Sequence, residues 1–405
     1  MNKITPRTLK GFRDFLPNEA RKRQYVINIL KRVFESYGFE PLETPIVEYE
    51  DILLGKYGEE EKLIYKFTTP GDDKVALRYD QTVPLARVLA QYGSTGEQKI
   101  TLPFKRYQIQ NVYRAENTQK GRYREFIQCD ADIIGENSIY ADAEILNLTL
   151  DIYKKLGIPV TIKINDRINF ESLDKKYIAA IDKLEKIGES EVLSEMISKG
   201  MTDTDAKKAL SELQNKPQTE SIEQIFSILE KMGADTTKIK YEPTLARGLD
   251  YYTGLIFETV AEGSTGSICS GGRWDEMIAK FSENDIPAVG FGLGFDRTIE
   301  LMEEMDLFPK NLFTARVLIL NIPGLESLAI KTAQDLRRSG INTDVFLNSS
   351  IDKAKQFSYA EKKNIPYTLL PAEDGTFTIG YKDEKGQILK EDSLTFVQLF
   401  ALLTK

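Results

Sequence analysis

The sequence of 405 residues contains no histidine at all. This absence excludes a histidine base, a histidine nucleophile and a histidine metal ligand. It therefore removes Ser-His-Asp and Cys-His triads, and HExxH metal sites. We expect any catalysis to depend on positioning and charge, supplied by arginine, lysine and carboxylate side chains.

Cysteine and long apolar segments are also scarce. The two cysteines, Cys129 and Cys269, form no CxxC pair, which argues against a disulfide framework and a cysteine-based zinc site. Residues 1–17 lack the apolar core of a signal peptide, and no later apolar run is long enough to span a membrane. We therefore expect a cytoplasmic protein without a membrane partner.

The remaining composition is that of an ordinary globular protein, with 41% hydrophobic and 29% charged residues. The length suggests two or three domains. The net charge of −8 does not indicate a nucleic-acid partner, although phosphate contacts depend on local basic patches rather than on the sum.

The first three quarters of the chain predict a catalytic domain interrupted by helices. A helix is predicted over residues 18–37, followed by an extended segment with Pro41 and Pro45 that would form a dimer edge or a capped sheet edge. Strands follow at 99–116 and 126–134, and later at 255–261 and 288–294. The charged, helical stretch between them predicts an insertion, so the expected divisions are 1–165, 166–240 and 241–306.

The last part of the chain, residues 315–405, alternates between strand and helix patterns. This alternation predicts a separate, mostly parallel α/β domain after a linker near Pro309. Its final helix is expected over residues 393–403.

Residues 105–124 combine six basic side chains with one acidic side chain and three tyrosines. Arg114 and Glu116 are two residues apart and would share a face of a strand, where they could clamp a nucleotide. Phe126 could stack on a base. An exposed hairpin of alternating charge explains the same pattern.

Residues 290–294 read GxGxG, which is not the GxGxxG of a dinucleotide-binding loop. In a strand, Gly290, Gly292 and Gly294 share one face and leave it bare, which makes a slot for a flat ring. Arg297 could close the slot and reach phosphates. Close packing of the strand on a helix is the alternative.

Three shorter segments complete the candidate site. In residues 77–84, Asp80 and Thr82 alternate onto one side of an extended segment and could hold an ammonium group, unless this is a polar edge strand. In residues 245–254, Arg247 precedes Tyr251 and Tyr252, which predicts a pocket for a small anionic ligand, or else a surface hairpin. Residues 269–275 pair a double glycine with Trp274, the only tryptophan, whose usual place is the core.

These segments together resemble the class II aminoacyl-tRNA synthetases. The strand with Pro45, the hairpin with Arg114 and Glu116, and GxGxG with Arg297 resemble motifs 1, 2 and 3 of that class. The segments LRYDQT, GRYREFIQCDADIIG and ARGLDYYTG resemble the histidyl-tRNA synthetases, and the resemblance covers essentially the whole chain. It implies an α+β catalytic domain with an antiparallel sheet, a helical insertion and a C-terminal α/β domain like an anticodon-binding domain.

The resemblance also implies roles for particular residues. Catalysis would depend on Arg247 and Arg114. ATP would be held by Arg114, Glu116, Phe126 and Arg297. Histidine would be held by Asp80, Thr82, Gln128, Asp132, Arg247, Tyr251 and Tyr252. The acceptor end of tRNA would meet residues 117–122, including Gln119, Lys120 and Arg122. The cofactors would be ATP and Mg²⁺, with no metal ligand assigned to the protein.

The implied reaction activates histidine with ATP and transfers it to the 3′ end of tRNA-His, in a homodimer. The alternative is a non-catalytic, synthetase-like regulatory subunit of histidine biosynthesis. Such proteins usually lose ATP and tRNA residues and lack the C-terminal domain, whereas Arg114, Arg247, Arg297 and that domain are present here. A class II enzyme specific for proline or threonine fits ARGLDYYTG less well. The family's GGRYD is GGRWD in this chain, so Trp274 would alter a pocket contact. The C-terminal segment 352–360 also departs from the family pattern.

Overall fold

The computed structural model describes residues 4–55, 58–93, 100–118, 122–247, 252–263, 266–275, 278, 286–310, 312–382 and 387–404, with the backbone alone at 58–60. The chain divides into two compact units, Met1–Phe308 and Pro309–Lys405. Within the described ranges, no helix is both long and apolar enough to cross a bilayer.

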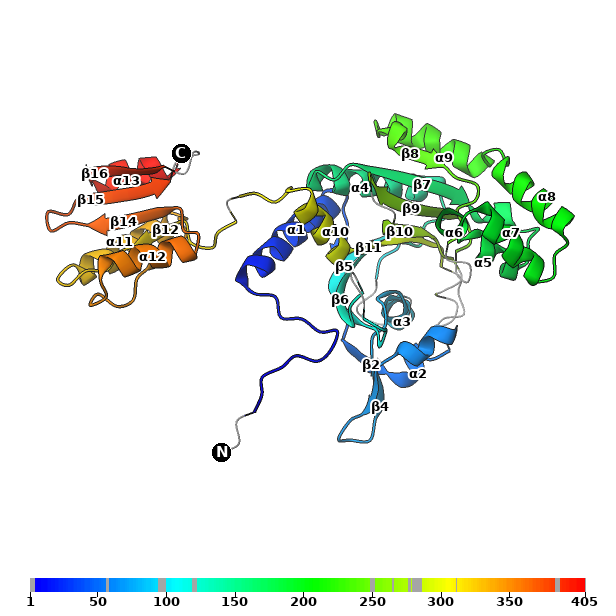
Figure 1. The fold of residues 1–405 in the computed structure, drawn as a ribbon, viewed down its shortest axis with the longest axis horizontal. Coiled ribbons are helices and arrows are strands. Elements are labelled where there is room, and N and C mark those ends of the chain that lie inside the picture. The colour runs from blue at the N-terminus through cyan, green and yellow to red at the C-terminus, as the bar shows by residue number, and fades with distance from the viewer. Residues whose placement is uncertain are drawn as a thin grey trace. The chain divides into compact units, whose positions relative to one another are not determined.

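The first unit is built on an eight-stranded sheet with the order β1-β5-β6-β11-β10-β9-β7-β8 (Figure 1). Its inner neighbours, from β5 to β7, all pair antiparallel, while β1 and β8 join the edges as parallel strands. The strands are β1 (Glu40–Pro41), β5 (Phe104–Tyr113), β6 (Glu125–Ile134), β7 (Val160–Asp166), β8 (Ile239–Tyr241), β9 (Leu255–Ala261), β10 (Ser267–Arg273) and β11 (Ala288–Gly294).

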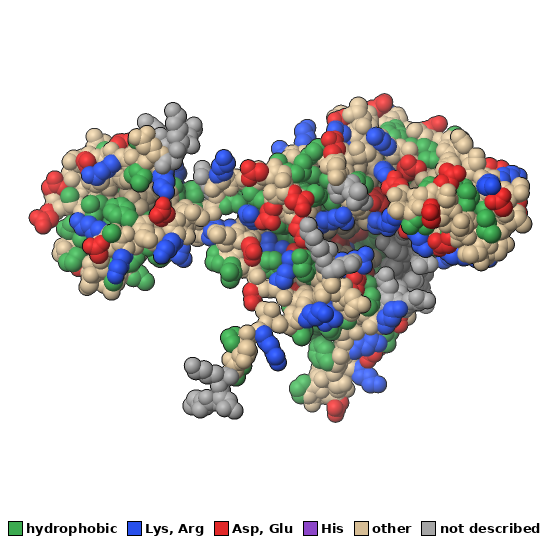
Figure 2. Space-filling view, in the orientation of Figure 1, with side chains coloured by type: hydrophobic (Ala, Val, Ile, Leu, Met, Phe, Trp, Pro, Cys, Tyr) green, Lys and Arg blue, Asp and Glu red, His purple; other side chains and the backbone are tan. Residues whose placement is uncertain are grey.

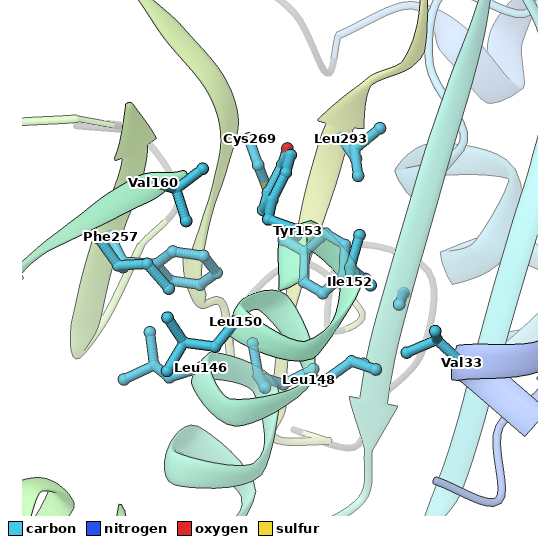
Figure 3. Close-up of a cluster of buried hydrophobic side chains, with 14 of the residues drawn as sticks. Val33, Leu146, Leu148, Leu150, Ile152, Tyr153, Val160, Phe257, Cys269 and Leu293 are labelled. Atoms are coloured by element: carbon cyan, nitrogen blue, oxygen red, sulfur yellow. The ribbon is translucent and has the colours of Figure 1, made fainter. Parts of the chain in front are cut away.

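One face of this sheet is covered by helices. They are α1 (Pro17–Ser36), α4 (Ile139–Leu156), α9 (Glu220–Lys231) and α10 (Phe295–Glu304). The odd-numbered side chains of β6, Cys129, Ala131 and Ile133, point into the same core as these helices. Figure 3 shows α4 side chains such as Leu148 and Tyr153 packed beside Phe257 and Leu293 of the strands. This dry, close-packed layer fixes the strands that carry the site on their opposite face.

The opposite face carries polar side chains and α3 (Thr82–Tyr92), which Figure 1 shows on the other side of the sheet from α1 and α10. The prediction of an extended segment through residues 77–84 is wrong from Thr82 onward, because that residue begins a helix. Asp80 Oδ1 accepts a hydrogen bond from the backbone N–H of Val83 at 3.1 Å, which supports the first turn. Asp80 and Thr82 therefore do not alternate along a strand.

A small three-stranded sheet, with the order β2-β4-β3, precedes α3 in the sequence. Its strands are β2 (Val47–Tyr49), β3 (Lys66–Thr68) and β4 (Lys74–Leu77), with α2 (Glu50–Leu53) and the 3₁₀ helix η1 (Gly58–Leu63) between the first two. The extended segments expected around Pro45 and over residues 77–84 overlap this sheet only at Val47 and Leu77, because its strands are just three or four residues long.

Four helices between β7 and α9 form a separate cluster with its own apolar core. They are α5 (Lys175–Ile181), α6 (Leu184–Ile187), α7 (Glu189–Ser198) and α8 (Asp203–Gln214), after the 3₁₀ helix η2 (Arg167–Phe170). Acidic and basic side chains are interspersed over their outer surface (Figure 2), as expected for solvated helix faces. The next helix, α9, packs on α4 in the core of the large sheet, followed by the 3₁₀ helix η3 (Thr236–Lys238) and β8.

The second unit has a five-stranded sheet with the order β13-β12-β14-β15-β16. The prediction of a mostly parallel sheet is wrong for half of it, because β14, β15 and β16 pair antiparallel. The final helix also begins at Phe396 rather than residue 393, after a strand that the sequence did not predict. The elements are β12 (Val317–Ile319), α11 (Glu326–Arg338), β13 (Thr343–Val345), α12 (Lys353–Lys362), β14 (Tyr367–Pro371), β15 (Phe377–Lys382), β16 (Ile388–Leu394) and α13 (Phe396–Thr404).

Candidate active site

A cavity of about 460 Å³ opens on the polar face of the large sheet. It lies over β6, β11 and β10, and side chains from segments far apart in the sequence line it. Among the lining residues are Thr82, Arg114, Arg122, Phe126, Gln128, Asp130, Asp132, Arg247, Tyr252, Trp274, Gly290, Gly292, Gly294 and Arg297. The fold therefore brings most of the predicted site residues together.

The floor of the cavity is a stripe of side chains beside a stripe of glycines. Gln128, Asp130 and Asp132 alternate along β6, and in the strand pairing they lie opposite Gly294, Gly292 and Gly290 of β11. A Cβ atom at Gly290 would lie only 2.0 Å from Asp132 Oδ1 and 2.5 Å from the Ala131 carbonyl oxygen. The glycine stripe is thus required for the carboxylates to occupy this space.

Asp132 is a buried carboxylate with a buried counter-ion. Arg106 Nη2 lies 2.5 Å from Asp132 Oδ2, and the Arg106 side chain is 0% exposed. Burial raises the pKa of Asp132, while the charge of Arg106 and hydrogen bonds from Trp274 and Arg106 act in the opposite direction. The alternative of an exposed hairpin is wrong for Arg106, because β5 directs this side chain inward.

Trp274 lines the cavity and is also buried in an apolar cluster with Leu89 and Ala288. Trp274 is therefore both a core residue and a residue of the cavity wall. Its indole N–H can only donate, and its proximity to Asp132 favours the ionised carboxylate, which lowers the pKa of that group against the effect of burial. Arg273, beside it, makes two hydrogen bonds to Asp142 of α4, at 3.1 and 2.6 Å, and anchors β10 to the helical layer.

Asp130 is a second buried carboxylate in the cavity, which the sequence reasoning did not select. It is 3% exposed, and the Gln128 amide donates to its two oxygens at 3.0 and 2.9 Å. Burial raises its pKa from 3.8 to about 7; Arg106 opposes the shift, whereas Asp132 and Asp80 add to it. The signal for Asp130 was present, since it lies on the same strand face as Gln128 and Asp132.

Arg114 lies where the hairpin meets the cavity. Its Nε donates to the Tyr79 carbonyl oxygen at 3.2 Å, and its guanidinium lies 4.3 Å from the Tyr79 ring and 5.2 Å from the Phe126 ring. The strand ends at Tyr113, so the expectation that Arg114 and Glu116 share a strand face is wrong. Glu116 lies in the loop, 3.6 Å from Arg122, and does not line the cavity.

Arg297 borders the cavity at the first turn of α10. Its Nη1 donates to the Ser267 carbonyl oxygen at 2.9 Å, and the guanidinium packs against the backbone of Gly266, where a Cβ atom would meet Nη2 at 2.0 Å. The helix start is fixed by Asp296, whose Oδ1 accepts from Arg13 at 2.8 Å and from Arg23 at 2.6 Å. Arg13 also lies 3.2 Å from the centre of the Tyr123 ring, so the N-terminal segment ties the hairpin to α10.

Arg247 lines the cavity from the loop that precedes β9. Its Nε donates to Glu258 Oε2 at 2.6 Å, an ion pair that the sequence reasoning missed. Tyr252 lies over the backbone of Gly272, where a Cβ atom would approach its ring to 2.9 Å. Tyr251, Gln119 and Lys120 lie outside the described residues. Asp80 does not line the cavity, although it is close enough to Asp130 to affect its pKa.

Comparison with known proteins identifies this arrangement. A model of the family described as histidyl-tRNA synthetase matches residues 11–167 and 163–298. The histidine–tRNA ligase of Cytophaga hutchinsonii is 37% identical, in an alignment that covers 91% of this chain and 93% of that protein. The chain belongs to the histidyl-tRNA synthetase family.

Other relatives extend over the full length. The histidine–tRNA ligase of Helicobacter hepaticus is 36% identical and covers 99% of both chains. The crystal structure of histidyl-tRNA synthetase from Nostoc sp. PCC 7120 superimposes with a TM-score of 0.86 at 28% identity, again over 99% of both chains. The predicted fold class, an α+β catalytic domain with an antiparallel sheet, a helical insertion and a C-terminal α/β domain, is confirmed. As a histidyl-tRNA synthetase, the protein is an aminoacyl-tRNA synthetase and an ATP-dependent ligase.

Proposed function

We propose that the cavity activates L-histidine with ATP and that the protein transfers the activated histidine to the 3′ end of tRNA-His. The observation that carries this proposal is the composition of the cavity. It joins a buried acidic floor to three arginines, Arg114, Arg247 and Arg297, around a glycine-lined slot. An acidic floor suits a ring that donates hydrogen bonds, and the arginines suit a carboxylate and phosphates.

The amino-acid end of the site is assigned to the β6 floor. Asp132 accepts a hydrogen bond from an imidazole N–H, and Tyr252 faces the same ring. Gln128, Asp80 and Thr82 are assigned to the amino group, and the family resemblance assigns Tyr251 to the same end of the site. A pocket built to pair with an N–H rejects isosteric side chains without one by roughly 10⁴ to 10⁵, because its buried groups would be left unpaired.

The nucleotide end is assigned to the glycine stripe and the hairpin. Phe126 and Arg297 enclose the adenine in the slot, while Arg114 holds phosphate oxygens and Glu116 approaches from the loop. The short distances from the Arg114 guanidinium to the Tyr79 and Phe126 rings support this assignment, because the two rings restrict where the guanidinium can lie at the cavity wall. Arg122, with Gln119 and Lys120, meets the acceptor end of tRNA.

In the first step, an oxygen of the histidine carboxylate attacks the α-phosphorus, and the bond to the bridging oxygen breaks as pyrophosphate leaves. Both reactants are anions, so the main task of the protein is to hold them in line and stabilise the added charge. Arg247 contacts the carboxylate and the α-phosphate together. In the second step, a ribose hydroxyl of tRNA attacks the carbonyl carbon and AMP leaves, with the adenylate phosphate as the group that accepts the proton.

Magnesium fits this site as a companion of ATP rather than as a resident of a protein cage. Among the described residues, no group of three or more histidine, cysteine, aspartate or glutamate side chains is arranged to hold a metal ion. Mg²⁺ commonly keeps several waters and binds through one or two carboxylates and the substrate phosphates. Glu116 is the carboxylate that the proposal places near the nucleotide, and the ion would neutralise phosphate charge there.

The proposal extends to a cytoplasmic homodimer, in which residues 39–47 and the small sheet contribute to the subunit contact. Three large apolar side chains of this region, Ile46, Val47 and Tyr49, are exposed on the single chain. Exposed apolar side chains that are neighbours in the fold are typical of a surface covered by a partner.

Pyrophosphate exchange into ATP tests the proposed function directly, with each standard amino acid supplied separately. Exchange with histidine alone is the expected result. Absence of exchange with every amino acid, in a folded protein, would contradict the proposal and favour a regulatory role. Arg247→Ala should abolish exchange while thermal unfolding is unchanged, and near-normal exchange in that variant would remove Arg247 from the mechanism.

A further inference from the structure

Glu258 contacts the proposed catalytic arginine but has no part in the reaction described above. It lies in the middle of β9, eleven residues after Arg247, and accepts the hydrogen bond from Arg247 Nε at 2.6 Å. Its side chain is 14% exposed, against 36% for Arg247. The contact is therefore a charge-assisted bond beside the site, in an environment that screens it only partly.

The pairing between these two side chains is selective. In the sheet register, Glu258 lies opposite Lys163 of β7, which is the nearest cation by strand position. The ammonium group of Lys163 instead pairs with Glu185 of α6. Within the part of the chain that the structure describes, Arg247 is consequently the one ion-pair partner of Glu258.

A second cavity of about 420 Å³ lies on the other side of Arg247. Arg247 lines both cavities, whereas Glu258 lines only the second one. The other acidic side chains of the second cavity are Asp182, Glu185 and Glu242, with Lys186 beside them. Burial raises the pKa of Asp182, and the charge of Arg247 opposes that shift, so the two groups are electrostatically coupled. Arg247 thus lies between the site and competing carboxylates of the helical cluster.

We propose that Glu258 is a positioning residue, which holds the guanidinium of Arg247 at the boundary between the two cavities in the orientation that the reaction requires. The inference rests on the proposed function of Arg247. A guanidinium carries five N–H donors. With Nε–H bonded to Glu258, the four terminal N–H groups remain to contact the carboxylate and the α-phosphate at once. Without Glu258, the side chain gains freedom to turn toward Asp182, and the in-line arrangement is lost.

The test is steady-state pyrophosphate exchange in Glu258→Gln, in the full-length protein. Glutamine has the same shape and still accepts a hydrogen bond, but lacks the charge. We expect kcat to fall by at least roughly tenfold, with the KM values for histidine and ATP changing much less, because positioning affects the transition state more than binding. Glu258→Asp, which keeps the charge on a shorter side chain, should recover part of kcat. Glu262→Gln, an exposed partner of Lys238 near the end of the same strand, is the matched control and should retain wild-type kinetics.

A double-mutant cycle shows whether Glu258 acts through Arg247. In the Arg247→Lys background, which removes the Nε donor, Glu258→Gln should have little further effect on kcat. Wild-type kcat in Glu258→Gln, or the same fold-reduction in both backgrounds, would overturn the positioning role. Exchange by the wild type with a different amino acid would overturn the proposed specificity and leave this test valid. No exchange by the wild type at all would overturn both.

Discussion

Replacing Asp130 by asparagine tests whether the floor of the site is as buried as the structure has it. The variant keeps the shape of the side chain and one acceptor for the Gln128 amide, and it removes the ionisable group. The charged and titratable neighbours are Arg106 from β5, Asp132 from β6 and Asp80 ahead of α3. Each remains in place, so the change isolates the ionisation of one carboxyl group.

The magnitude follows from the shift in pKa from 3.8 to about 7. In the unfolded chain the carboxyl group loses its proton near pH 4, whereas in the folded chain it retains the proton until about pH 7. The folded state therefore binds more protons in this window, and stability falls as the pH rises through it. The whole shift corresponds to about 4 kcal/mol, of which about 3 kcal/mol is lost between pH 5 and pH 8.

Asp130→Asn should lose this dependence. We expect its free energy of unfolding, relative to the wild type, to rise by about 3 kcal/mol between pH 5 and pH 8. Calorimetric unfolding of the transition that contains the catalytic unit, followed across that pH range, measures the difference. Asp203→Asn, at an exposed position on α8 paired with Lys207, is the control and should show no such trend. A pH-independent difference between Asp130→Asn and the wild type would refute the reasoning.

Three further predictions concern the same cavity. Gly290→Ala should weaken histidine-dependent exchange by at least about tenfold, because its Cβ would meet Asp132 Oδ1 at 2.0 Å. Gly292→Ala should have a milder effect, because the atom nearest to its Cβ would be Asp130 Oδ1 at 3.2 Å. Equal effects of the two substitutions would argue against the geometry of the glycine stripe. Asp132→Ala should lose histidine selectivity more than ATP binding, and an unchanged KM for histidine would count against the imidazole contact. The same substitution should lower the free energy of unfolding by about 3 to 5 kcal/mol, because buried Arg106 loses its counter-ion. Arg297→Ala should raise the KM for ATP and leave the KM for histidine nearly constant, as measured by exchange with each substrate varied, and the reverse pattern would place Arg297 at the wrong end of the site.

Much of the site was predictable because it depends on local periodicity. The GxGxG of residues 290–294 places every second residue on one face, whatever the partner strand. Gln128 and Asp132 came from the family resemblance, and the alternation that would have added Asp130 was not used. The absence of histidine likewise restricted the chemistry to charge and positioning before any fold was considered. The resemblance of the motifs then supplied the family, which the relatives confirm.

Local patterns misled where a segment reads equally well in two conformations. Thr82 begins a helix rather than continuing a strand, since Asp80 caps the first turn. The hairpin strand ends one residue before Arg114, so strand alternation could not pair that side chain with Glu116. Element boundaries of this kind depend on which backbone groups find partners, and those partners lie elsewhere in the chain.

The sequence by itself determined the family, the chemistry available and the glycine stripe of the site. Only the tertiary structure decided that Arg106 is the buried counter-ion of Asp132, that Trp274 lines the cavity from an apolar cluster, and that Glu258 is bonded to Arg247. The physical reason is that spacing along a chain fixes which face a side chain occupies, whereas charge partners depend on strand register. That register pairs β6 with β11, more than 150 residues away, and is set by the packing of the whole sheet on its helices.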